Sequence, residues 1–103
     1  MAFKLDPEPT FQAEVRITVP GGGYLPLPLV FHHKTRSQLE EWLRRREQGD
    51  QEMLDEIVHD APSRPDGLTV KQFLLKLCDN YPAAALDVYS TYRFELQASR
   101  AKN

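Results

Sequence analysis

The side chains best suited to metal binding or nucleophilic chemistry are three histidines, His32, His33 and His59, and one cysteine, Cys78. His32 and His33 are adjacent at the end of a predicted strand, so their side chains point to opposite faces and do not share one metal ion. Cys78 lies on an apolar helical stripe, where burial raises the pKa of a thiol and makes it unreactive. The glycine-rich segment 21–23 lacks the lysine and hydroxyl residues of a phosphate-binding loop. The sequence therefore predicts no catalytic, cofactor-binding or metal-binding residue, and no enzyme.

Arg44, Arg45 and Arg46 form the most strongly charged run, which Lys34 and Arg36 extend. A nucleic-acid-binding protein usually combines such a patch with a recognition motif and a positive net charge. This chain of 103 residues has a formal net charge of −2 and no such motif, so nucleic acid is not an expected partner. The run is typical of a solvated helix end, or of a surface that binds an acidic partner segment.

Two stretches with alternating apolar residues predict strands. Apolar side chains occupy every second position over 11–19, and a second alternating set covers 25–31. The proline and glycines at 20–23 predict a turn between them. Pro26 and Pro28 are two residues apart, so both missing N–H groups lie on one edge and the other edge can pair with the first strand. The sequence thus predicts an antiparallel hairpin whose proline edge discourages further pairing.

Helix signals fill the rest of the chain. The segments 35–38 and 69–72 each begin with Thr and end with Gln, a capping-box pattern that predicts the start of a helix. Gly49 is predicted to end the first helix and Asp50 to cap the second. The predicted apolar face of that second helix is Met53, Leu54, Ile57 and Val58. Asp60–Gly67 holds prolines and a glycine, and we expect it to be the longest and most mobile loop.

Pro82 predicts the start of the last helix, because its fixed φ fits a first helical turn but not a helix interior. A two-stranded hairpin is marginally stable in water, so helices from the rest of the chain, or another subunit, must cover its apolar face. We therefore predict an α+β fold, with a small N-terminal antiparallel β-hairpin within 10–33 packed on a bundle of about four α-helices within 35–103. Residues 1–103 are expected to form a single domain.

The last predicted helix pair is rich in aromatic side chains. Tyr89 and Tyr92 lie three residues apart on the same predicted face as Leu86, which favours the core for both. Val88 and Phe94 depart from that face, and apolar side chains on the outer side of a helix are a common basis for partner docking. As a hypothesis, the partner-binding residues are Tyr81, Pro82, Val88, Tyr92, Phe94, Arg44 and Arg45.

The ending LLKLCDNYPAAALDVYSTYRFELQASRAKN, together with the earlier segments VRITVPG and KTRSQLEEWL, resembles the small tail assembly chaperones of long-tailed bacteriophages. The resemblance covers nearly the whole chain in layout, and its last block is the most specific. It implies a non-enzymatic protein that binds the long, largely helical tape measure protein while the tail tube forms, and that leaves before the tail is finished. The tail tube protein is a second candidate partner. We expect the last helix pair to supply the binding groove, with the loop Asp60–Gly67 allowing it to open.

Two other classes stay open. One is a structural minor tail or head-completion component that remains in the particle, and the other is a small regulatory module that binds protein or, less favoured, nucleic acid. The sequence lacks a secretory signal and an apolar stretch of bilayer length. We therefore expect a protein of the bacterial host cytoplasm, absent from the mature virion, with no membrane and no small-molecule substrate as partner. The oligomeric state, the bound partner segment and the existence of a frameshifted longer form are not determined by the sequence.

Overall fold

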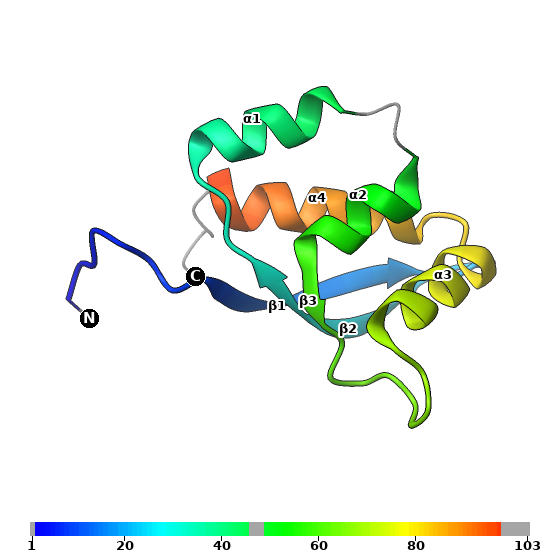
Figure 1. Ribbon diagram of the computed structural model, residues 1–103. Coiled ribbons are helices and arrows are strands. Elements are labelled where there is room, and N and C mark those ends of the chain that lie inside the picture. Colours follow the sequence, from blue (N-terminus) through cyan, green and yellow to red (C-terminus); the bar gives the residue numbers. More distant parts are fainter. Residues whose placement is uncertain (1, 46–48, 98–103) are drawn as a thin grey trace.

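The computed structural model describes residues 2–45 and 49–97. Within them the chain forms a three-stranded antiparallel sheet of order β1-β2-β3 and four helices, which confirms the predicted α+β class. The elements are β1 (Thr10–Thr18), β2 (Tyr24–His32), α1 (Arg36–Arg44), α2 (Asp50–Ile57), β3 (Val58–Asp60), α3 (Val70–Asn80) and α4 (Ala84–Gln97). Figure 1 shows α1, α2 and α4 on the same side of the sheet.

The predicted hairpin is confirmed over its full length. β1 and β2 pair from Thr10 opposite His32 to Thr18 opposite Tyr24. Pro26 and Pro28 interrupt none of this pairing, because their missing N–H groups point away from β1. Of the apolar side chains of β1, Ala13, Val15 and Ile17 are buried and Phe11 is partly buried against the core.

The third strand was not predicted. Val58 and Asp60, expected in a helix face and a loop, belong to β3, where they lie opposite Phe31 and Val30 of β2. The outer edge of β2, where Pro26 and Pro28 were expected to discourage further pairing, is thus paired with β3, at its end beyond the two prolines. The pairing is short and carries a register shift between Val30 and Phe31, so no alternating pattern marks it in the sequence.

Both capping boxes are confirmed. Thr35 accepts a hydrogen bond from the Gln38 backbone N–H at 3.2 Å, and the Gln38 side chain accepts one from the Thr35 N–H at 2.9 Å. The 69–72 segment repeats this arrangement at the start of α3. The predicted Asp50 cap is wrong, because Gly49 holds the N-cap position of α2 without a side-chain hydrogen bond. The predicted end of α1 at Gly49 is also wrong, because α1 ends at Arg44.

Tyr92 lies at the centre of the core, as its predicted core position required. Its ring is fully buried. The centroid of this ring lies 6.1 Å from the ring centroid of Phe11, 5.2 Å from that of Phe31 and 5.4 Å from that of Trp42. The phenol donates a hydrogen bond of 2.7 Å to the backbone carbonyl of His32. A single side chain of α4 therefore joins the hairpin to α1, and its polar atom is satisfied inside the core.

The predicted buried face of α4 is partly wrong. Val88, expected on the outer side, is 0% exposed, and Leu86, expected on the core side, is 66% exposed. The reason is that α4 packs on β1 and that the small side chains of Ala84 and Ala85 are part of its buried face. Val88 and Tyr92 continue this stripe at intervals of four residues, and Leu86 is turned outward.

Candidate functional site

An apolar cleft lies between α1, α2 and α4. It has a volume of about 310 Å³ and is bounded by Trp42, Leu43, Asp50, Met53, Leu86, Tyr89, Ser90 and Arg93. Three helices that are separate in the sequence supply these side chains. The groove was expected within the last helix pair, α3 and α4, and the cleft shares α4 with that pair.

The deep wall of the cleft is held in place by contacts between the helices. Trp42 is 1% exposed and donates its indole N–H to the backbone carbonyl of Met53 at 3.2 Å. Its ring meets that of Tyr89 edge-on, with 5.6 Å between ring centroids. The Tyr89 hydroxyl donates to the Asp50 carboxylate at 3.0 Å. These contacts give the cleft a preformed shape, with Leu86 as an exposed apolar side chain at its mouth.

Two of the predicted partner-binding residues are not available to a partner. Val88 and Tyr92 are both 0% exposed, so a ligand on the surface does not reach either side chain. Tyr81 is half-buried and packs against the core, and Pro82 is exposed in the turn before α4. Phe94 is 44% exposed and lies away from the cleft, on the side of α4 that faces β1.

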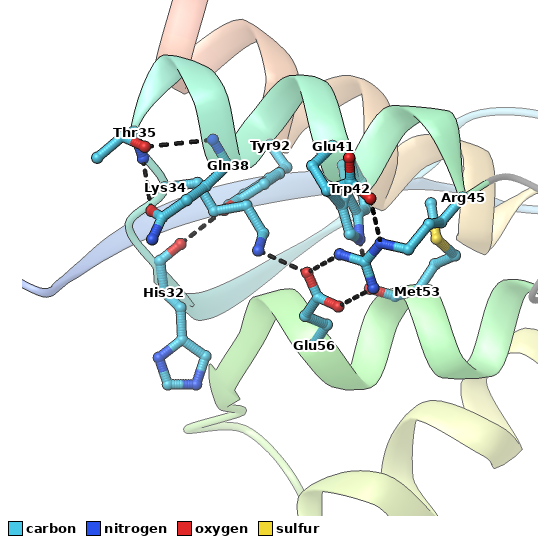
Figure 2. A network of polar contacts seen from close by, with 10 residues as sticks. All are labelled: His32, Lys34, Thr35, Gln38, Glu41, Trp42, Arg45, Met53, Glu56 and Tyr92. Carbon is cyan, nitrogen blue, oxygen red and sulfur yellow. Dashed lines mark hydrogen bonds and ion pairs between the residues drawn. The ribbon is translucent and has the colours of Figure 1, made fainter.

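Figure 2 shows Arg45 of the basic run, together with Lys34, bound to the Glu56 carboxylate. Arg45 makes two hydrogen bonds to Glu56 at 2.7 and 2.9 Å, and Lys34 reaches the same carboxylate at 2.5 Å. Hydrogen bonding from Arg45, assisted by Lys34, lowers the pKa of Glu56 from 4.5 to about 2. Arg44 lies 3.4 Å from Glu41. Arg46, the third member of the predicted run, lies outside the described residues.

The family comparison decides the identity of the chain. The sequence profile of the family described as "Phage tail assembly chaperone" matches residues 1–103. The chain belongs to this family. No curated protein and no solved structure matches it significantly. Across the described residues of the chaperone, no helix is long and apolar enough to cross a membrane.

Burial raises the pKa values of three ionisable side chains of the chaperone. It raises the pKa of the Cys78 thiol, and the nearby Asp50 and Asp55 carboxylates add to this effect. It also raises the pKa values of the Tyr89 and Tyr92 phenols. A raised pKa keeps a thiol or phenol protonated at neutral pH, and a protonated group is a poor nucleophile.

One contact between histidines escaped the sequence reasoning. His32 of β2 contacts His59 of the neighbouring strand β3, with 4.9 Å between ring centroids and the rings edge to face. Burial, and then the proximity of His59 and Lys34, lowers the pKa of His32. Among the described residues, no group of three His, Cys, Asp or Glu side chains is placed to hold a metal ion. The pair depends on β3, so no spacing in the sequence indicated it.

Proposed function

We propose that this tail assembly chaperone binds an amphipathic helical segment of the tape measure protein in the cleft between α1, α2 and α4. The binding is reversible and involves no covalent chemistry. It covers apolar helical surface of the partner until the tail tube encloses that surface. The observation that carries this proposal is the cleft itself, an open apolar depression with Leu86 at its mouth that is 66% exposed.

The chemistry of the cleft matches a helix better than a small polar molecule. Leu43, Leu86 and Tyr89 present apolar surface above the buried Trp42 and Met53, which suits the repeated apolar side chains of an amphipathic helix. Asp50 and Arg93 at the boundary carry charges of opposite sign and can set the direction of the bound helix. The cleft is preformed, so little of the binding energy is spent on ordering it.

The proposal includes the place of action. The chaperone works in the host cytoplasm, holds its partner during tail assembly and is absent from the finished particle. The tail tube protein is the second candidate partner. The predicted opening of the loop Asp60–Gly67 is not needed for this cleft, which none of its residues borders. Arg64 donates to the Ala61 carbonyl within that loop at 3.3 Å and to the Leu68 carbonyl just after it at 2.9 Å.

Co-expression with the tape measure protein tests the proposal. We expect the chaperone to increase the soluble fraction of its partner, and Leu86→Asp to reduce the affinity by about tenfold or more, because a charge replaces an apolar anchor. Leu75→Asp is the matched control. Leu75 on α3 is 59% exposed, similar to Leu86, but lies outside the cleft.

Three outcomes would contradict the proposal. The tape measure protein could be equally soluble with and without the chaperone, which would contradict a chaperone role toward this partner. Leu86→Asp and Leu75→Asp could reduce the affinity equally, which would contradict the cleft as the binding site. Detection of the chain in purified virions at stoichiometric amounts would favour a structural tail or head-completion component instead.

A further inference from the structure

β1 is an outer strand, and the hydrogen bonds at the ends of the hairpin show which of its backbone groups face outward. The His33 N–H donates to the Pro9 carbonyl at 2.8 Å, and the Val19 N–H donates to the Gly23 carbonyl at 3.0 Å. In an antiparallel ladder, hydrogen-bonded pairs alternate with non-bonded pairs. The odd-numbered residues of β1 therefore bond to β2, and its even-numbered residues present their N–H and C=O groups to the free edge.

Two further observations support this assignment. Pro26 and Pro28 have no N–H to donate and lie opposite Arg16 and Glu14, the even-numbered positions. The N–H of Thr18 donates to the Asp87 carboxylate of α4 at 2.8 Å, away from β2. Asp87 thereby covers one end of the free edge.

The remaining edge is open over residues 12–16. Among the hydrogen bonds within the described part of the chain, none involves the backbone N–H of Gln12, Glu14 or Arg16. All three residues are exposed. A row of unpaired donors and acceptors on an edge strand is a template for one more strand. Its length suits an added strand of about five residues at about 3.4 Å per residue.

A cleft of about 490 Å³ runs along this edge. Its wall on the side of α4 is formed by Ser90, Thr91, Phe94 and Glu95, and Glu14 and Arg16 form the other. Phe94 is 44% exposed, so an apolar surface stands beside the unpaired backbone. An exposed strand edge with a helix alongside is the arrangement in which peptide-binding domains accept an extended peptide by strand addition.

We propose that the β1 edge binds an extended peptide segment of the partner protein as a fourth, outer strand of the sheet. The segment carries an apolar side chain that contacts Phe94 and a basic side chain that pairs with Glu14. The Arg16 guanidinium is stacked on the Tyr24 ring, 4.9 Å from its centroid. Because Arg16 is engaged in this way, we expect Glu14 to determine the preference of the edge for a basic side chain of the peptide. A second copy of the chain fits less well, because α4 stands beside the edge and obstructs a whole domain more than a single strand.

This inference rests on the proposed function, because the extended segment belongs to the same polypeptide partner as the helix in the other cleft. The two sites use different residues, so they can be tested separately. The probes are short overlapping synthetic peptides that cover the tape measure protein. Binding is measured to ¹⁵N-labelled chaperone, with amide hydrogen exchange read at each residue.

The expected result is a peptide that slows exchange at Gln12, Glu14 and Arg16. Glu14→Pro should weaken this peptide by about tenfold or more, since it removes an outward N–H and leaves the pairing with β2 intact. Glu14→Gln keeps the N–H and removes the charge, so it should weaken binding by about threefold. Gln12→Pro provides a second proline variant if Glu14→Pro does not fold, as judged by its circular dichroism spectrum.

Specific results would overturn the inference. Peptides that bind only in the cleft of Leu86, without slowing amide exchange along β1, would refute peptide binding at the strand edge. The proposed function would not be affected by this result. Failure of every peptide to bind at either place, together with no effect on partner solubility, would refute both. A concentration-dependent dimer that Glu14→Pro dissociates would identify a second copy as the occupant and refute the proposed peptide.

Discussion

Replacing Glu56 by Gln should destabilise the chaperone in a way that depends on pH. Glu56 of α2 accepts hydrogen bonds from Arg45, which follows α1, and from Lys34, which follows β2. One carboxylate thus ties three parts of the chain together (Figure 2). Glutamine has nearly the same shape but no charge, so Glu56→Gln leaves two cations beside a neutral amide.

The size of the effect follows from the pKa. The fall from 4.5 in the unfolded chain to about 2 in the folded protein corresponds to about 3 kcal/mol. The Glu56 side chain is 30% exposed, so solvent screening reduces the expected contribution to about 1–2 kcal/mol. Because folding lowers this pKa, the contribution is fully present above pH 4.5 and is lost as the pH falls from 4.5 towards 2.

Urea unfolding of the parent and Glu56→Gln proteins at a series of pH values measures this contribution. At pH 7 we expect the variant to have a free energy of unfolding lower by about 1–2 kcal/mol. The difference should shrink below pH 4.5 and approach zero near pH 2. The control is Glu40→Gln, because Glu40 forms two exposed ion pairs, with Arg36 and Arg44, each at 3.9 Å, and we expect a change below about 0.5 kcal/mol.

A difference that stays constant between pH 7 and pH 3 would refute the reasoning, because it would show that the charge of Glu56 does not supply the stability. Equal effects of Glu56→Gln and Glu40→Gln would also refute it. That result would mean that the contacts to Arg45 and Lys34 stabilise no more than an ordinary surface ion pair does.

Two other predictions concern the buried face of α4 and the cysteine. Tyr92→Phe should lower the free energy of unfolding by about 1–2 kcal/mol in urea titrations, because the His32 carbonyl loses its hydrogen-bond donor; an unchanged midpoint would contradict this. Cys78 should react slowly with iodoacetamide in the folded protein, and its rate should reach half-maximum at a pH above 9.0, since burial raises the thiol pKa. The same protein unfolded in urea is the control, and equal rates in both states would contradict the prediction.

Features that depend on local sequence were predictable. The two capping boxes involve residues three positions apart, and the hairpin follows from alternation and a turn in a continuous stretch. β3 was missed because its short pairing with β2 is set by tertiary contacts, and Val58 also fits the apolar spacing of α2.

The candidate site was predicted less well than the fold. The face of α4 was misjudged because large apolar residues were given more weight than the small ones that are part of its buried face. The stripe of Ala84, Val88 and Tyr92, at intervals of four residues, was the available signal. The apolar cleft combines α1, α2 and α4, so no single segment indicated it. The open edge of β1 became visible only when the pairing register was known.

Trp42 gives the chaperone an intrinsic optical probe. It is the only tryptophan in the sequence, and it lines the apolar cleft while its indole N–H is fixed to the Met53 carbonyl. Binding of a partner helix would change the packing around this one chromophore, whereas a peptide on the β1 edge would leave its surroundings unaltered. Emission spectra of the unlabelled protein can therefore separate events at the two surfaces within one titration.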